Sequence, residues 1–228
     1  MTSIPASRIF MYDYIFFDLD GTLTDSQDGI FAALHVMLAH FGLSRTNEEL
    51  KPFLGPSLWD SCPKYLGFTH DQCAEAIEVF REFYNREGIF INRVYDGIIP
   101  LLQKLKAAKK HLVLATGKPD EQANVVMTHF KLAPYFDFIG GSTLDTSRSR
   151  KADVIAYAMQ NCGLTTADAK AGRILMVGDR ENDINGAHQN GIPCAAVLYG
   201  YGSRPEFEAH HADYICPSVH DLERLLLG

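Results

Sequence analysis

The chain has 228 residues, of which 46% are hydrophobic, and a formal net charge of −7. This length fits one large domain or a domain with a small insert, and the apolar content is that of a globular protein. The acidic balance disfavours nucleic acid and anionic membrane surfaces as partners.

Short apolar runs alternate with segments of helical period along most of the chain. Most runs are rich in β-branched or aromatic residues, and polar residues or glycine follow them. The runs are Tyr14–Phe17, His111–Ala115, Phe136–Ile139, Ile174–Val177 and Cys194–Val197. Such runs are typical of strands buried on both faces of a parallel sheet.

The segments between the runs carry apolar residues at helical spacing. We expect helices over Asp96–Lys109, Pro119–Phe130, Ala152–Cys162 and Glu181–Asn190, and a last helix that begins at a capping box, Ser218–Asp221. Because strands and helices alternate, the predicted fold class is α/β, with a doubly wound, mainly parallel sheet.

The long stretch between the first two predicted strands contains no convincing strand. Ser26–Phe41 has a continuous apolar face at helical spacing, and a capping box at Thr69–Gln72 begins another helix. This is too much helix for one crossover. We therefore expect an inserted helical cap subdomain over residues 24–93 and an α/β core domain over 1–23 and 94–228. The alternative is that these helices extend the main layer.

Cysteine usage and the N-terminus bear on the compartment. The five cysteines are an odd number and include no CxxC pair, so we expect free thiols in a reducing compartment. Met1–Phe10 has one basic residue and no long apolar run, which does not fit a secretory signal. No segment approaches the roughly 18 consecutive apolar residues of a membrane span. A cytoplasmic protein is expected.

Two carboxylates directly follow the first predicted strand, in the sequence Asp18-Leu-Asp-Gly-Thr-Leu-Thr24. Asp18 and Asp20, two residues apart at a strand end, can point the same way, and Gly21 allows a sharp turn. Such a pair suits a hard cation, or one carboxylate that attacks while the other handles protons. A solvated acidic turn is the alternative, and the apolar strand argues against it.

Two further features could bind an anion. Thr116 and Gly117 follow the second predicted strand at the mouth of a helix, where a hydroxyl and backbone N–H groups can cradle a phosphate. Lys151 stands at the start of another helix, against the macrodipole, and an anion there would resolve the conflict. Each has an ordinary alternative, a loop turn for the first and a surface lysine for the second.

A second acidic pair, Asp179 and Asp183, follows the fourth predicted strand in Gly178-Asp-Arg-Glu-Asn-Asp183. One of the two could simply cap the following helix. Ligands of open α/β sheets bind outside the carboxyl ends of the strands, so both acidic pairs are expected in one crevice. Four carboxyl groups there would repel one another unless a cation lay between them.

In this order, the DxDGT box, the strand-end threonine, the downstream lysine and the GDxxxD box resemble the haloacid dehalogenase-like hydrolase superfamily. Within it, Phe53–Leu58, Gly178–Ile184 and Leu198–Gly202 are similar to the phosphoglycolate-phosphatase-like group. The resemblance implies that Asp18 is a nucleophile that forms an aspartyl-phosphate. It also implies that Asp20 protonates the leaving oxygen and then activates water.

The remaining roles also come from the resemblance. Thr116, Gly117 and Lys151 would bind the phosphoryl oxygens, and the cofactor would be Mg²⁺. The metal set would be Asp18, Asp20 through its carbonyl, Asp179 and, in support, Asp183.

The resemblance implies a Mg²⁺-dependent phosphatase that acts on a small phosphorylated metabolite, with phosphoglycolate as the leading candidate. A 5′-nucleotidase or a sugar-phosphate mutase could use the same core. A phospho-receiver signalling module is a more distant alternative, and a non-catalytic binding protein is another. The insert would act as a lid that supplies substrate contacts. We expect a monomer or homodimer.

Overall fold

The computed structural model describes residues 12–145 and 147–228. They form two compact units, one of residues up to Thr24 with Val94–Gly228 and the other of Asp25–Arg93. Met1–Phe10, where the sequence predicts no secretory signal, lies outside the described residues. No helix in the described ranges is long and apolar enough to cross a membrane.

The first unit is built on a parallel sheet of six strands in the order β5-β4-β1-β6-β7-β8. Phe17 of β1 pairs with Leu114 of β4 on one side and with Val177 of β6 on the other. This arrangement confirms the predicted α/β, mainly parallel fold. The strands are β1 (Tyr14–Phe17), β4 (His111–Pro119), β5 (Phe138–Ser142), β6 (Ile174–Gly178), β7 (Cys194–Val197) and β8 (Tyr214–Cys216).

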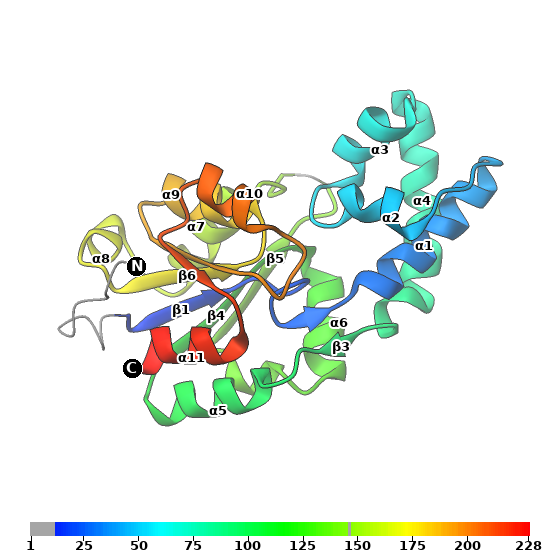
Figure 1. Ribbon diagram of the computed structural model, residues 1–228. Helices are drawn as coiled ribbons and strands as arrows, with labels where there is room; N and C mark the ends of the chain where they lie inside the picture. Colours follow the sequence, from blue (N-terminus) through cyan, green and yellow to red (C-terminus); the bar gives the residue numbers. More distant parts are fainter. Residues whose placement is uncertain (1–11, 146) are drawn as a thin grey trace. The chain divides into compact units, whose positions relative to one another are not determined.

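Helices cover both faces of this sheet (Figure 1). On one face α5 (Ile98–Ala107) contacts α11 (Val219–Leu227), and on the other α7 (Lys151–Asn161) contacts α9 (Glu181–Gln189). Apolar side chains of α7 and α9 pack on the sheet in one buried core cluster, which stabilises the unit. The other helices are α6 (Asp120–His129), α8 (Thr166–Lys170) and α10 (Arg204–Ala209), with a 3₁₀ turn at Ala133–Tyr135.

The second unit is helical. Thr69 begins α4 with the predicted capping box, since its side chain accepts the backbone N–H of Gln72 and the Gln72 side chain accepts that of Thr69. Helix α4 contacts both α1 and α3. The helices are α1 (Gln27–His40), α2 (Asn47–Leu50), α3 (Leu58–Leu66) and α4 (His70–Arg86), with 3₁₀ turns at Lys51–Phe53 and Gly88–Phe90.

The two chain connections between the units contain short strands. These are β2 (Thr24–Asp25) and β3 (Arg93–Val94), which pair with one another as a separate two-stranded sheet. In the first unit, β1 lies between β4 and β6, where the strand order reverses direction. Open α/β sheets bind ligands outside the carboxyl ends of the strands at such a reversal. A ligand site is therefore expected at the carboxyl ends of β1, β4 and β6.

Candidate active site

Strand β1 brings Asp18 and Asp20 to the carboxyl edge of the sheet. The backbone N–H of Asp18 donates to the C=O of Val177 at 2.9 Å, so Asp18 is anchored against β6. The chain then turns at Gly21, which has a φ of +81°, a conformation that favours glycine. The Gly21 N–H closes the turn by donating to the C=O of Thr24 at 2.7 Å.

Asp18, Asp179 and Asp183 meet beyond the strand ends. Each offers one carboxylate oxygen, and the three oxygens lie within 4.8 Å of one another. Asp179 and Asp183 are fully buried, and Asp18 is only 9% exposed. Like charges this close repel, and burying them is costly unless cations compensate. The three oxygens form a donor set for a hard divalent cation.

Lys151, the first residue of α7, supplies part of the compensation. Its Nζ lies 2.8 Å from Asp18 Oδ1 and 2.7 Å from Asp183 Oδ1, and it donates to the C=O of Ala115 at 3.2 Å. By hydrogen-bond geometry, neither carboxylate oxygen has an aligned donor among the described residues. The two contacts are therefore ion pairs that leave acceptor capacity for a cation or for donors on a ligand.

Asp179 is held from two directions. Thr22 Oγ1 donates to its Oδ1 at 3.2 Å, and the backbone N–H of Tyr201 donates to its Oδ2 at 2.8 Å. The loop that carries Tyr201 comes so close that a Cβ at Gly200 would lie 2.4 Å from the Asp179 Cβ and 2.3 Å from the Gly21 oxygen. Only glycine fits there. The sequence alone indicates no role for Thr22 or Tyr201.

The two carboxylate oxygens of Asp183 make different contacts. Its Oδ2 accepts the backbone N–H groups of Asp179 at 3.0 Å and of Arg180 at 3.1 Å, which caps the start of α9. Its Oδ1 faces Lys151 in the acidic cluster. Asp183 therefore both caps helix α9 and belongs to the acidic cluster.

Thr116 and Gly117 lie near the carboxyl end of β4. Thr116 is buried, its hydroxyl accepts the backbone N–H of Lys118 at 3.2 Å, and its proximity to Asp18 lowers the pKa of that carboxyl group. Gly117 is exposed, and its C=O accepts the hydroxyl of Ser142 at 2.7 Å. Thr116 thus lies next to the acidic cluster.

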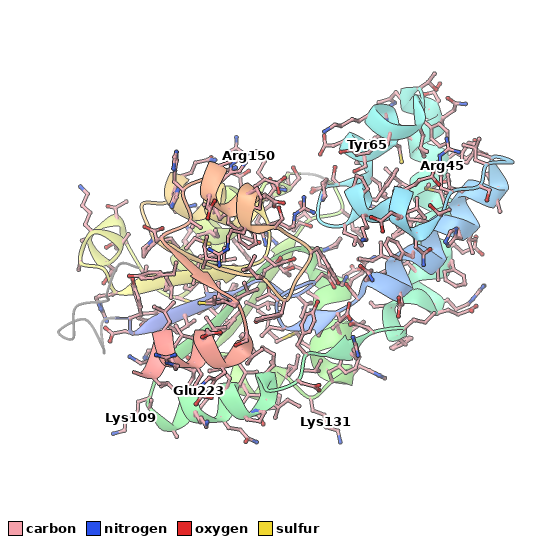
Figure 2. All side chains as sticks on the ribbon, in the orientation of Figure 1. Arg45, Tyr65, Lys109, Lys131, Arg150 and Glu223 are labelled. Atoms are coloured by element: carbon pink, nitrogen blue, oxygen red, sulfur yellow. The ribbon has the colours of Figure 1, made fainter. Side chains whose placement is uncertain are left out.

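Asp20 is not part of the acidic cluster. Its Oδ2 forms an ion pair with Lys118 Nζ at 2.7 Å, and the Lys118 side chain is only 4% exposed. By contrast, Lys109 and Lys131 project outward into solvent (Figure 2). The sequence alone indicates no role for Lys118. The available signal was its spacing, because residues two apart in a strand point to the same side and Thr116 is already at the site.

Burial governs the electrostatics of the cluster. It raises the pKa of Asp18 to about 6; the Lys151 charge partly offsets this rise, the Asp183 charge adds to it, and the Thr116 hydrogen bond opposes it. Burial, then the charges of Asp183 and Asp18, raise the pKa of Asp179 well above its usual range. Burial alone would lower the pKa of Lys151, but the two facing carboxylates outweigh it and raise the pKa. Without a cation, Asp18 and Asp179 hold protons more tightly than usual.

These parts define a class of protein. A carboxylate beside a buried lysine, a hydroxyl and two further acids, at the reversal point of an α/β sheet, fits a hydrolase that transfers phosphoryl groups with help from a metal. The chain belongs to the haloacid dehalogenase-like hydrolase family, whose model matches residues 15–197. This result confirms the resemblance found in the sequence.

The relatives include phosphatases that match nearly the whole chain. A 5′-nucleotidase of Pseudomonas aeruginosa is 37% identical over 216 residues, which cover 94% of this chain and 96% of the relative. Phosphoglycolate phosphatase 1 of the same organism is 32% identical over 82% of this chain and 70% of its own length. Tyrosine-protein kinase PtkA of Mycobacterium tuberculosis is 36% identical, but the match covers only 62% of that protein.

A solved structure supports the same conclusion. The crystal structure of a predicted phosphatase from Clostridium acetobutylicum has a TM-score of 0.88 and 42% identity, covering 94% of this chain and 97% of that one. The family and its phosphatase relatives establish that this protein is a phosphatase of the phosphoglycolate-phosphatase-like group.

Proposed function

We propose that the protein hydrolyses phosphate monoesters of small metabolites with Mg²⁺, through a phosphoryl group carried transiently by Asp18. The observation that carries the proposal is the position of the Asp18 carboxylate. It lies beside Lys151 and within a cluster that includes Asp179 and Asp183. A carboxylate so placed has a cation at hand to offset the repulsion of an incoming phosphate.

The residues present fit Mg²⁺. The three carboxylate oxygens of Asp18, Asp179 and Asp183 are hard donors close enough to share one ion. Buried oxygens of Asp18 and Asp183 also lack an aligned donor among the described residues. We assign Asp18, Asp179 and the Asp20 carbonyl as ligands, with Asp183 in support. When bound, Mg²⁺ would offset the negative charges of the phosphate and the attacking carboxylate.

The chain's own groups divide the chemistry. A carboxylate oxygen of Asp18 attacks phosphorus while the ester oxygen leaves and takes a proton from Asp20. Water then attacks the phosphoryl group on Asp18, gives a proton to Asp20 and releases phosphate, which restores both carboxyl groups. Thr116, the Gly117 backbone and Lys151 hold the phosphoryl oxygens. Lys151 can exchange its ion pair with Asp18 for one with the substrate.

Two substrate classes come first. The sequence motifs favour phosphoglycolate, whereas the fuller and more identical match to a 5′-nucleotidase favours nucleoside 5′-monophosphates. We propose nucleoside 5′-monophosphates as the first candidates and phosphoglycolate as the second. The lid role expected for the inserted helices stays a prediction, as do the expectations of a cytoplasmic protein and of a monomer or homodimer.

Other reactions of the same core give different products. The family and the phosphatase relatives set aside the phospho-receiver alternative and the non-catalytic one. A sugar-phosphate mutase would isomerise its substrate without net release of phosphate. Activity like that named for the mycobacterial relative would place phosphate on tyrosine instead of releasing it.

A metabolite screen tests the proposal. Nucleoside 5′-monophosphates, phosphoglycolate and hexose phosphates are incubated with the protein and Mg²⁺, and released phosphate is measured. We expect release from at least one of the first two classes, loss of release with EDTA and recovery with added Mg²⁺. Activity indifferent to chelation would contradict the metal assignment, and isomerised sugar phosphate without free phosphate would favour the mutase.

A further inference from the structure

The ion pair between Lys118 and Asp20 connects two strand ends. Lys118 belongs to β4 and Asp20 follows β1, and their Nζ and Oδ2 atoms lie 2.7 Å apart. The Lys118 side chain is 4% exposed and that of Asp20 21% exposed. This is a partly buried contact at the candidate active site rather than a surface ion pair, which would contribute little.

The buried ammonium group of Lys118 requires a compensating anion. Taking an ammonium group out of water is costly unless an anion compensates it. The acidic cluster already has a buried lysine, because Lys151 lies between Asp18 and Asp183. Lys118 instead faces Asp20, the one carboxylate of the two acidic pairs that lies outside the cluster. The site therefore assigns a separate lysine to the carboxylate expected to move protons.

The two oxygens of Asp20 have different surroundings. Oδ2 is held by Lys118, whereas Oδ1 is buried and has no hydrogen-bond partner within the described ranges. A free aspartate can rotate about both side-chain torsions, but fixing one oxygen fixes the direction of the other. Lys118 thus restrains the side chain with Oδ1 unoccupied and ready to exchange a proton with a ligand.

We propose that Lys118 is a positioning residue for Asp20, holding Oδ2 so that Oδ1 exchanges the proton in both steps. This inference rests on the proposed acid–base role of Asp20. Oδ1 gives its proton to the ester oxygen as the phosphorus–oxygen bond to the leaving group breaks. It takes a proton from water as the water oxygen bonds to phosphorus and the bond to Asp18 breaks. Lys118 keeps its protons throughout.

Leaving-group dependence tests this role. A poor leaving group needs the proton more than a good one, so kcat/KM is measured for phenyl phosphate and for p-nitrophenyl phosphate. In Lys118→Met we expect kcat/KM for phenyl phosphate to fall about 100-fold, within the range for acid–base catalysis, and that for p-nitrophenyl phosphate to fall about 10-fold or less. An equal fall for both esters would mean lost binding or structure and would overturn the proposal.

A double-mutant cycle separates this inference from the function on which it rests. If Lys118 acts through Asp20, adding Lys118→Met to Asp20→Asn should lower kcat/KM by less than about 3-fold more. If the double variant instead loses the product of the two single losses in kcat/KM, Lys118 acts independently of Asp20 and the inference is overturned. If Asp20→Asn alone leaves the leaving-group dependence unchanged, the acid–base role of Asp20 fails instead.

A second buried lysine provides the matched control. Lys110, just before β4, is also buried, and its Nζ donates to the C=O of Tyr12 at 2.6 Å. Lys110→Met is expected to lower thermal stability without changing the ratio of kcat/KM between the two esters. If Lys118→Met does not fold, Lys118→Gln and the shorter Lys118→Ala are measured in its place. Gln keeps a donor for Asp20, whereas Ala does not. A normal ratio of kcat/KM between the two esters in both variants would contradict the proposal.

Discussion

Asp18 Oδ1 and Lys151 Nζ lie 2.8 Å apart, although one residue follows the first strand and the other begins a helix far along the chain. The parallel sheet makes this possible because β1 and β4 are neighbours and α7 packs on β4. The lysine also holds Asp183 at 2.7 Å. One buried cation thus compensates two of the three clustered acids, which leaves a net negative site.

Removing that cation should affect both stability and activity. In Lys151→Met, we expect kcat to fall about 100- to 1,000-fold, as when a charge-stabilising donor is lost. We also expect a loss of about 3–5 kcal/mol in the free energy of unfolding at pH 7.5, because buried carboxylates lose their partner. Urea unfolding measures it. The loss should be smaller at pH 5, where Asp18 can take up a proton. The exposed Lys109→Met is the control.

Neutralising Asp18 should stabilise the metal-free protein. Burial raises the pKa of Asp18 from 3.8 to about 6, so the folded state holds this proton more tightly than the unfolded chain does. The resulting stability is fully present below about pH 4 and is lost as the pH rises through about 6. Asparagine does not titrate. The melting temperature of Asp18→Asn should therefore exceed that of the wild type above pH 6, and the gap should shrink towards pH 4.

Saturating Mg²⁺ provides a check on the previous prediction. The ion should raise the melting temperature of the wild type more than that of Asp18→Asn, because it compensates the carboxylate that the variant lacks. A variant that melts lower than the metal-free wild type at pH 7.5 would contradict the view that the ionised cluster is destabilising.

The loop around Gly200 should control metal affinity. A methyl group in Gly200→Ala would collide with the Asp179 side chain, at 2.4 Å from its Cβ, and displace a proposed ligand. We expect Mg²⁺ binding, measured by titration calorimetry, to weaken about 10- to 100-fold, as when the support of a ligand is lost. Gly163→Ala is the control, because alanine would strain the backbone there, at φ +68°, but its Cβ would meet nothing within 4 Å. Equal Mg²⁺ affinity in Gly200→Ala and Gly163→Ala would show that the loop around Gly200 does not control metal affinity.

Much of the fold follows from the sequence, and the differences have local causes. β1 and β7 have their predicted bounds. β4 runs on to Pro119 instead of ending at Ala115, with a register irregularity between the two. The Thr-Gly-Lys-Pro sequence is typical of a turn, but in the structure it continues the strand, and Pro119 pairs with Ser142 of β5. For this reason the sequence does not indicate a role for Lys118.

Other elements gave weak signals. β5 is Phe138–Ser142, shifted from the predicted Phe136–Ile139, because it includes two glycines that a strand prediction avoids. A Cβ at Gly141 would lie 2.5 Å from the Lys118 carbonyl oxygen, so the close approach of the two backbones requires glycine. β8 and α10 are too short for periodicity to show them. The contacts of Thr22 and Tyr201 with Asp179 depend on tertiary packing, which spacing along the chain does not encode.

The most direct test of the proposed chemistry is to isolate the phosphoryl group on the protein. Wild type and Asp20→Asn are mixed with p-nitrophenyl phosphate and Mg²⁺, quenched in acid during turnover, digested and analysed by mass spectrometry. We expect one phosphoryl group on the peptide that contains Asp18, sensitive to hydroxylamine as an acyl phosphate is, with more of it in Asp20→Asn. Turnover with no phosphorylated peptide in either protein, or with the phosphoryl group on another residue, would contradict the assignment of Asp18 as the nucleophile.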